Sequence, residues 1–311
     1  MNDHQQRDPE APEPHDRPGA PDPRGQHDPR AEDACALCGA RALEPRFSKG
    51  GWRFVRCAAC GLVAIRPLPS PEDHARHTEQ SYAEGAYAVF TAADAIRSAI
   101  AAHRLAIVRR TAPPGPWLDV GCSTGAFVDV AQRAGMDITG LERAAAAVEQ
   151  ARARGLRVRQ SSIEAFSPPH RYAVVTAFDL VEHLRDPLAF VRRVEGWLAP
   201  GGVFALTVPN IHSLTARLMG RHWFYYSPPD HVHYFCPATL RRLLASAGLD
   251  DIRLGPTSKP LSLEYAALAL AQFNVRLGSA ARRVVGMLPS ALRTRVWPLR
   301  IGELLAIARV A

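Results

Sequence analysis

The segment at residues 117–125, Trp-Leu-Asp-Val-Gly-Cys-Ser-Thr-Gly, constrains the fold of this chain more than any other stretch. A short apolar run ends in Gly121 and a helix-compatible segment follows Gly125, which predicts a buried strand that turns tightly into a helix. Glycine at both positions allows a positive φ and a close approach of a ligand to the backbone. A second apolar run, residues 136–141, places Glu142 at its carboxyl end, where a carboxylate can accept hydrogen bonds from a ribose diol.

The turn lacks two glycines of the usual dinucleotide-binding pattern, G-x-G-x-x-G. Ser123 and Ala126 stand where the second and third glycines would be, so close docking of a pyrophosphate is disfavoured. Asp119, at the end of the expected strand, suits a cationic amino group better than a phosphate. These features favour S-adenosylmethionine, which carries a ribose, an amino acid head and a sulfonium but no phosphate. A glycine turn in some other α/β domain is the alternative for this stretch alone.

Length and composition indicate a globular protein with room for more than one module. The chain has 311 residues, of which 47% are hydrophobic and 22% charged, so a buried core is expected. The net charge of +8 permits an anionic partner such as nucleic acid, a phosphorylated sugar or a membrane surface. Residues 1–33 are rich in proline and charge, which predicts a disordered tail without a signal peptide. We therefore expect a cytoplasmic protein with reduced cysteines.

Two matched C-x-x-C-G repeats follow the tail. Cys35 and Cys38 form the first pair, and Cys57 and Cys60 form the second. This spacing predicts a four-cysteine zinc ribbon over residues 34–66, because each pair can fold two thiolates around one metal ion. With four protein ligands the Zn²⁺ would be structural. Disulfides are the alternative, and a cytoplasmic setting disfavours them.

Strand and helix patterns alternate through most of the remaining chain. Residues 67–91 are expected to form a linker, and residues 92–110 an alanine-rich helix that covers the following domain. Strands are then expected at 117–120, 138–141, 156–159, 172–178 and 203–208, with helices between most of them. Such alternation is typical of parallel βαβ units and therefore predicts an α/β fold.

Four motifs in this region resemble those of class I S-adenosylmethionine-dependent methyltransferases, over roughly residues 92–311. They are residues 118–125, Gly-Leu-Glu at 140–142, Phe-Asp-Leu-Val-Glu-His-Leu-Arg-Asp-Pro at 178–187 and Leu-Ala-Pro-Gly-Gly at 198–202. The resemblance implies a Rossmann-like seven-stranded sheet with a reversed last strand, to which residues 302–309 are similar. The ribbon and Pro-Leu-Pro-Ser-Pro at 67–71 also resemble the N-terminal part of a bacterial subgroup associated with sugar, surface-glycan or lipid biosynthesis.

The resemblance also implies which residues contact the cofactor. Asp119, Gly121 and Gly125 would hold the methionine moiety of S-adenosylmethionine, and Glu142 would bind its ribose. Ile163 would lie against the adenine. The remaining expected contact, on the other side of the pocket, is Asp179.

Candidate catalytic groups follow the fourth strand of the expected domain and return in an insertion at residues 209–235. They are Glu182, His183, His231 and His233. A base is needed only where the acceptor must lose a proton. The pattern resembles the Glu-x-x-Glu-His and later His of small-RNA 3′-end and quinone O-methyltransferases, where a divalent metal can hold the acceptor hydroxyls. Structural roles for the histidines are the alternative.

Two further segments are expected to shape the acceptor side. Residues 221–227 are dense in aromatic side chains, which either stack on a sugar or base or form the packed root of a lid. Residues 261–296 form an apolar and basic insertion with no acid between Glu264 and Glu303. That composition fits a peripheral contact with an anionic membrane, and helices packed on the sheet edge or in a dimer are the alternative.

These patterns predict a methyltransferase that acts on a small-molecule, sugar or lipid-linked glycan acceptor, chiefly at oxygen. An rRNA methyltransferase and a nucleotide-sugar C-methyltransferase are alternatives within the enzymes. Nucleic acid is disfavoured because the ribbon is only moderately basic and no Asn-Pro-Pro-Tyr-like motif follows the fourth strand. A non-catalytic zinc-ribbon binding module is the rival outside the enzymes, and the complete pattern of Gly121, Gly125 and Glu142 argues against it.

Overall fold

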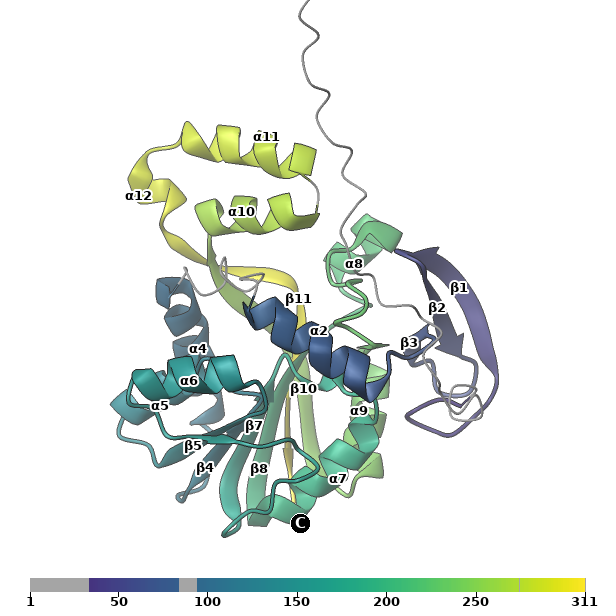
Figure 1. The fold of residues 1–311 in the computed structure, drawn as a ribbon, viewed down its shortest axis with the longest axis vertical. Helices are drawn as coiled ribbons and strands as arrows, with labels where there is room; N and C mark the ends of the chain where they lie inside the picture. Colours follow the sequence, from purple (N-terminus) through teal and green to yellow (C-terminus); the bar gives the residue numbers. More distant parts are fainter. Residues whose placement is uncertain (1–33, 84–93, 274, 311) are drawn as a thin grey trace, which may run out of the picture.

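Two β-sheets organise the described part of the protein, one of seven strands and one of four (Figure 1). The computed structural model describes residues 34–83, 94–273 and 275–310. The disordered tail expected at residues 1–33 lies outside these ranges, as does part of the expected linker. No helix in the described ranges has both the length and the apolar character needed to span a bilayer.

The larger sheet has the strand order β10-β11-β8-β7-β4-β5-β6. Neighbouring strands from β8 to β6 run parallel, whereas β11 pairs antiparallel with both β8 and β10. The expected Rossmann-like sheet of seven strands with a reversed last strand is therefore confirmed. Its strands are β4 (Trp117–Val120), β5 (Ile138–Glu142), β6 (Val158–Gln160), β7 (Tyr172–Phe178), β8 (Leu198–Pro209), β10 (Asp250–Ser262) and β11 (Val296–Arg309).

Helices cover both faces of this sheet, which explains why its middle strands are apolar throughout. Every residue of β7 is buried, a pattern typical of a parallel strand covered on both sides. Val174 packs in the core cluster that includes α4, α5 and α6, and Val175 packs in the cluster that includes α7 and α9. These helices are α4 (Asp94–Val108), α5 (Ala126–Arg133), α6 (Ala145–Ala153), α7 (Pro187–Trp197) and α9 (Pro237–Ser246).

The four-stranded sheet combines the cysteine ribbon with a strand from far along the chain. It pairs β1 (Leu43–Lys49), β2 (Trp52–Cys57) and β3 (Val63–Arg66) with β9 (His233–Tyr234), all antiparallel. Strand β9 lies in the insertion at residues 209–235, so that insertion is attached to the ribbon. Trp223 and Tyr226 are buried in one core cluster with Phe54 of β2. Of the two roles expected for the aromatic segment 221–227, stacking on a ligand or packing in the protein, these two residues show packing.

Shorter elements complete the surroundings of the sheet's carboxyl edge. Helix α2 (Pro71–Ala83) occupies much of the expected linker and packs against α6. The 3₁₀ turns η1 (Val181–His183) and η2 (Gly220–His222) and the helix α8 (Leu214–Met219) follow β7 and β8.

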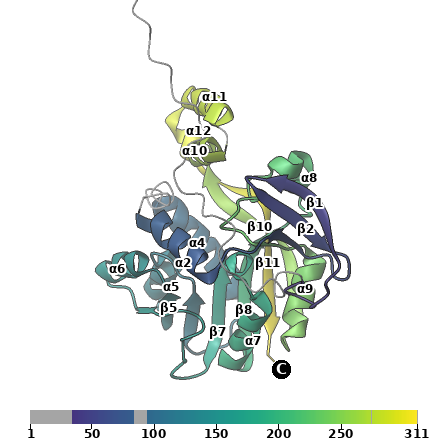
Figure 2. The ribbon, with the colours of Figure 1, turned by 45° about the vertical axis from the view of Figure 1, so that its right-hand side comes forward.

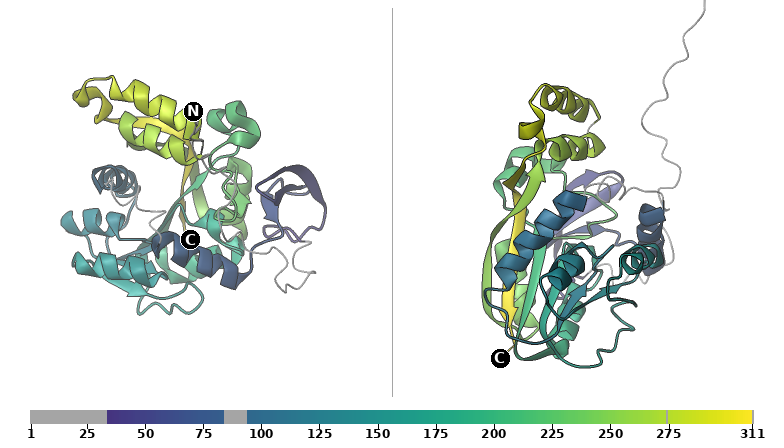
Figure 3. Two further views of the ribbon diagram at one scale, coloured as in Figure 1. Left: turned by 45° about the horizontal axis from the view of Figure 1, so that its top comes forward. Right: turned by 90° about the vertical axis from the view of Figure 1, so that its left-hand side faces the viewer.

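Residues 261–296 form a helical extension beyond the sheet (Figures 2 and 3). Its helices are α10 (Leu263–Phe273), α11 (Val275–Gly286) and α12 (Ser290–Arg293), which lie between β10 and β11. Helix α10 packs mainly on α11 and only lightly on β10.

Candidate active site

The loop between β4 and α5 has the tight, left-handed geometry that its glycines predict. Gly121 has φ 69° and Gly125 has φ 82°, a region that favours glycine. A Cβ atom at Gly121 would lie 2.9 Å from Leu180 Cδ1, and one at Gly125 would lie 2.5 Å from Leu156 Cδ1. Both positions therefore exclude larger residues through backbone conformation and through packing.

Glu142 ends β5 with a carboxylate that the backbone holds in one orientation. Its Oε2 atom accepts a hydrogen bond from the Ser123 amide at 2.9 Å. Its Oε1 atom accepts from the Arg143 and Ala144 amides at 2.8 and 2.9 Å. Because each carboxylate oxygen offers two lone pairs, Oε2 retains one for a ligand hydroxyl. The backbone thus fixes a carboxylate that has one position open to a ligand hydroxyl, as the predicted ribose contact requires.

Asp119 is a buried carboxyl at the end of β4. It accepts a hydrogen bond from Thr176 Oγ1 at 2.6 Å, and no ion pair in the described part of the chain includes it. Burial raises the pKa of Asp119 to about 7. An ammonium group beside this carboxyl would offset the burial and restore the ionised form. The environment of Asp119 therefore fits the amino group of S-adenosylmethionine.

The expected cofactor contacts are ordered along one edge of the sheet. Parallel strands end at the same edge, and the order β7-β4-β5-β6 aligns Asp179, Asp119, Glu142 and Ile163 in that sequence. Ile163 is half-buried and packs against the core beside Phe166. The arrangement matches the general location of ligands in open α/β sheets, outside the carboxyl ends of the strands.

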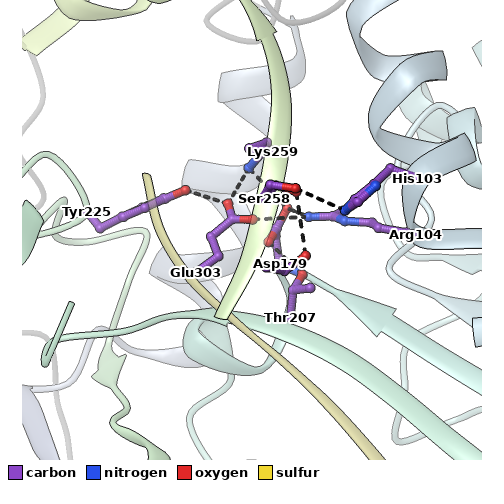
Figure 4. A network of polar contacts seen from close by, with 9 residues as sticks. His103, Arg104, Asp179, Thr207, Tyr225, Ser258, Lys259 and Glu303 are labelled. Carbon is purple, nitrogen blue, oxygen red and sulfur yellow. Dashed lines mark hydrogen bonds and ion pairs between the residues drawn. The ribbon is translucent and has the colours of Figure 1, made fainter. Parts of the chain in front are cut away.

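Asp179 carries the most heavily paired carboxylate of this edge (Figure 4). It accepts hydrogen bonds from Arg104 Nη2 at 2.7 Å and from Thr207 Oγ1 at 2.8 Å, and Lys259 Nζ lies 3.5 Å away. Burial alone would raise the pKa of Asp179, but the charges of Arg104 and Lys259 outweigh it and hold the pKa well below the usual range. Asp179 is therefore ionised at neutral pH.

The same network extends to β11 and to the loop after η2. Lys259 Nζ and Tyr225 Oη both donate to Glu303 Oε1, and Arg104 Nη2 lies 3.8 Å from Glu303 Oε2. Two cations thus face two carboxylates, and they come from elements that are distant in sequence. Sequence reasoning identified only Asp179 among them. The other members are Arg104, Tyr225, Lys259 and Glu303, and no sequence pattern indicated that they would meet.

The candidate catalytic groups Glu182, His183 and His231 meet beside this network. One potential ligand atom from each lies within 4.8 Å of the others. The rings of the two histidines have centroids 4.7 Å apart and lie nearly perpendicular. The Val232 amide donates to the Glu182 carbonyl at 2.9 Å, so the insertion is tied to η1 by its backbone.

The hydrogen bond of His231 defines which nitrogen can act as a base. Its Nδ1 atom lies 2.8 Å from the Tyr225 carbonyl oxygen, which can only accept, so we assign the proton to Nδ1 and the lone pair to Nε2. Burial lowers the pKa of His231, and burial with the neighbouring His231 lowers the pKa of His183 to about 3. Both imidazoles are therefore neutral at pH 7, the state that a general base requires.

His233 differs from this pair although the sequence places it close by. It is fully buried, and its Nδ1 donates to the Leu184 carbonyl at 2.9 Å. Burial and the charge of Arg66 lower the pKa of His233 to about 3. It is not part of the Glu182 cluster and joins β9 to the segment after η1 instead.

Glu182 has an unsatisfied carboxyl oxygen at the centre of the site. Its Oε2 atom is buried without a hydrogen-bond partner among the described atoms. Burial and the nearby Asp179 raise the pKa of Glu182 well above its ordinary value. A buried polar atom without a partner is costly, so this oxygen fits an acceptor hydroxyl or a cation that is supplied from outside.

Helix α2 adds groups that the sequence had not indicated. His77 Nε2 lies 2.8 Å from Asp230 Oδ1, and Asp230 directly precedes His231. The helix begins five residues after the last ribbon strand, so the N-terminal part of the chain contacts the candidate site directly. A histidine in an expected linker carried no signal of this role.

The four ribbon cysteines have the arrangement of a metal centre. The Sγ atoms of Cys35 and Cys60 are 3.5 Å apart, those of Cys38 and Cys57 are 3.6 Å apart, and all four lie within 4.8 Å of one another. None of them forms a disulfide. A tetrahedron with Zn–S bonds of about 2.3 Å has edges of about 3.8 Å, so the donor set and its size fit Zn²⁺.

Residues 92–254, just over half of the chain, match the family described as methyltransferase domain. The chain is 31% identical over 163 residues to the ubiquinone biosynthesis O-methyltransferase of Nitrosospira multiformis, which covers 48% of this chain and 68% of that protein. It is 30% identical over 148 residues to the enzyme of the same name from Vibrio cholerae, covering 43% of this chain and 60% of that protein. The matches thus span 60 to 68% of the length of these relatives.

Two solved structures share the fold. One is an S-adenosylmethionine-dependent methyltransferase of Thermotoga maritima, described as a possible histamine N-methyltransferase, with TM-score 0.50, 16% identity and coverage of 75% of this chain and 98% of that chain. The other is the [4+2]-cyclase SpnF, with TM-score 0.52, 18% identity and coverage of 78% and 98%. At these identities the likeness concerns the fold alone.

Proposed function

The chain belongs to the methyltransferase domain family and is an S-adenosylmethionine-dependent methyltransferase, and we propose that it methylates an oxygen of a small-molecule, sugar or lipid-linked glycan acceptor. The observation that carries this proposal is the cluster of Glu182, His183 and His231, in which His231 has a lone pair assigned to Nε2 and Glu182 has an unpartnered Oε2, because O-methylation of a hydroxyl requires a group that removes a proton. The names of the two O-methyltransferase relatives support the same reaction class.

The proposed cofactor site uses the residues along the carboxyl edge. Asp119 would pair with the amino group, the backbone at Gly121 and Gly125 would face the methionine moiety, and Glu142 Oε2 would accept from the ribose. Ile163 and Asp179 would close the two sides. We add Arg97 of α4, whose Nη2 donates to Thr124 Oγ1 in the motif loop, as a partner for the cofactor carboxylate.

His231 is the proposed general base. When bound, S-adenosylmethionine supplies a methyl carbon already activated by its sulfonium, so positioning provides much of the catalysis. His231 would accept the hydroxyl proton at Nε2 while Nδ1 stays bound to the Tyr225 carbonyl. The carboxylate of Asp230 would stabilise the resulting imidazolium, since its charge already acts to raise the pKa of His231. Glu182 would hold the acceptor through its free oxygen.

A divalent cation is the second role that these three side chains can fill. Glu182, His183 and His231 offer one carboxylate oxygen and two imidazole nitrogens within a short range of one another. A cation would ionise Glu182 and could bind an acceptor hydroxyl directly. Removal of metal with EDTA and addition of Mg²⁺ or Mn²⁺ without Zn²⁺ tests this role, because recovery of activity under those conditions cannot come from the ribbon.

The ribbon and the domain limits stay proposals of the same kind. We propose that Cys35, Cys38, Cys57 and Cys60 hold one structural Zn²⁺ within residues 34–66, and that residues 92–311 form the methyltransferase domain. A cytoplasmic enzyme is the setting that fits four reduced thiolates. Metal analysis of purified protein, with about one zinc per chain expected, tests the ribbon directly.

The cofactor site is tested by calorimetric titration of S-adenosylmethionine. We expect the wild-type protein to bind and Glu142→Ala to bind roughly 10- to 100-fold more weakly, because a hydrogen bond to a charged group contributes about 1.5 to 3 kcal/mol. A folded, zinc-loaded wild-type protein that does not bind the cofactor would contradict the assignment and favour a non-catalytic binding module.

The base is tested with His231→Asn, which keeps a donor for the Tyr225 carbonyl but removes the Nε2 lone pair. We expect methyl transfer to fall by roughly 10²- to 10⁴-fold while cofactor affinity stays unchanged. His233→Asn is the matched control, since it keeps the bond to the Leu184 carbonyl outside the cluster. Equal activities for the two variants would exclude His231 as the base. Labelled methyl transfer to phenols, nucleotide sugars, lipid-linked glycans and rRNA identifies the acceptor class.

A further inference from the structure

Large apolar side chains are exposed on two segments of the described chain. Leu214 and Leu218 project from α8, and the second group, from α11 to the start of β11, comprises Val284, Met287, Leu292 and Val296. Leu218 is 77% exposed and Met287 is 78% exposed, so these side chains cover nothing in the protein itself. Single exposed apolar residues are common on soluble proteins, but a concentration on two segments marks a contact surface.

The two segments lie at the same end of the molecule. In Figures 1, 2 and 3, α8 and the helices α10–α12 extend from the same end of the large sheet. Thr215 Oγ1 of α8 donates to the Ile301 carbonyl of β11 at 2.9 Å, which ties α8 to the strand that carries Val296. We call this surface, defined by α8 and residues 284–296, the apolar end.

The charge of the apolar end is positive throughout. Exposed arginines lie in the same segments as the exposed apolar side chains: Arg217 and Arg221 are close to Leu218 in the sequence, and Arg282, Arg283 and Arg295 flank Met287 along the chain. The sequence contains no aspartate or glutamate from residue 265 to 302, and none from 209 to 229. Apolar side chains combined with arginines and without acids are the features that interfacial membrane segments share.

We propose that the apolar end docks on the surface of a bilayer that contains anionic phospholipids. Leu214, Leu218, Met287 and Leu292 enter the headgroup region, and the arginines contact lipid phosphates. A second copy of the chain fits this surface less well, because a two-fold contact would bring its arginines against one another. Nucleic acid also fits less well, since its interfaces are predominantly polar and leave no place for four exposed aliphatic side chains.

The proposed orientation would turn the acceptor side toward the membrane. Strand β10 ends and β11 begins at the carboxyl edge of the parallel strands, where Lys259, Glu303 and Tyr225 meet beside His231. An amphiphilic acceptor could therefore reach the site from the bilayer. Docking itself rests only on the surface, so its failure would leave the O-methyltransferase proposal intact.

The test is flotation of the full chain with vesicles of phosphatidylcholine alone or with added phosphatidylglycerol. We expect binding to the anionic vesicles and little binding to the neutral ones. Arg282→Glu with Arg283→Glu should weaken anionic binding more than about 10-fold, since each basic residue near an anionic surface contributes a factor of about five. Leu218→Ser with Met287→Ser should weaken it as well, because both apolar anchors are lost.

The matched control is Arg192→Glu with Arg193→Glu, an adjacent pair of exposed arginines on α7, away from the apolar end. This variant should bind like the wild type, and cofactor binding verifies that every variant is folded. Equal loss in the two charge-reversed pairs would overturn the proposal in favour of a general charge effect. Failure of the wild type to bind, or a dimer in sedimentation that the Ser variants abolish, would also overturn it.

Discussion

Asp119 is a buried carboxyl, and in the proposed cofactor site its cationic partner would come from the ligand rather than from the protein. Because its pKa is raised to about 7, half of the free protein carries a protonated Asp119 at that pH. The ammonium group of S-adenosylmethionine binds the ionised form, so binding must expel this proton at lower pH.

Cofactor affinity should therefore be highest above pH 7. It should decrease as the pH falls through 7, by roughly tenfold per pH unit between about pH 7 and pH 5. Calorimetric titration across this range measures the slope. Asp119→Asn should bind more weakly but without the slope. The same slope in that variant would assign the proton to another group.

His233 gives a second expectation at the scale of single residues. Its pKa is about 3 in the folded protein and near 6.5 when unfolded, so the unfolded state takes up the proton first as the pH falls. The free energy of unfolding should drop by about 1.4 kcal/mol per pH unit between about pH 6.5 and pH 3 from this group. Urea denaturation of His233→Asn should show a smaller pH dependence than the wild type, and an identical dependence would show that the burial of His233 is not its cause.

Among the elements, the pairing of β3 with β9 connects the proposed zinc site to the segment that carries the proposed base. Ala64 lies opposite His233 and Val63 opposite Tyr234, two and three residues after His231. If the four cysteines hold Zn²⁺ as proposed, its loss should loosen β3 and with it the loop that holds His231, because a structural zinc site contributes folding free energy.

Zinc removal should therefore reduce methyl transfer more than cofactor affinity, since Asp119 and Glu142 lie on other strands. Parallel measurements of activity and cofactor binding for Cys38→Ser test this separation. Cys236→Ser serves as the control, because it changes a buried thiol outside the ribbon. If Cys38→Ser kept full activity after losing its zinc, the proposed link would be wrong.

The elements themselves were largely predictable, and the reason is local. Gly121, Gly125 and Glu142 lie within one βαβ unit, so spacing along the chain was enough to place them together. Helix α2 was not predicted, because its polar sequence resembles a linker and its partner Asp230 lies far along the chain. Strand β9 was not predicted either, since two residues carry no periodic signal.

For the whole molecule, the ion network at Asp179 connects a helix and strands that are far apart along the chain. Arg104 of α4 and Lys259 of β10 both pair with Asp179, which follows β7, and the same two cations also face Glu303 of β11. Spacing cannot reveal such a network, because its members share neither a motif nor a period. The sequence therefore predicted that the loop at residues 121–125 meets Glu142, but it did not predict the partners of Asp179.

Removal of one charge from this network should be costly. Lys259→Met leaves two carboxylates against Arg104 alone, and we expect a loss of roughly 3 kcal/mol in the free energy of unfolding, typical of breaking a buried pair. Lys259→Met combined with Glu303→Gln restores the balance and should recover part of the loss. Urea denaturation measures the free energy of unfolding of the two variants. A double variant that is no more stable than Lys259→Met would show that the charges do not interact.

The pairing of β3 with β9 also has a consequence for biosynthesis. The cysteine ribbon leaves the ribosome early, yet its sheet lacks its fourth strand until residue 234 has been made. Phe54 likewise stays exposed until Trp223 and Tyr226, which pack on it, have been made. A nascent chain that stops before that residue has all four ribbon cysteines but an open apolar sheet edge, which favours association with other chains. Completion of the most N-terminal sheet is thus coupled to synthesis of the segment that carries the proposed base.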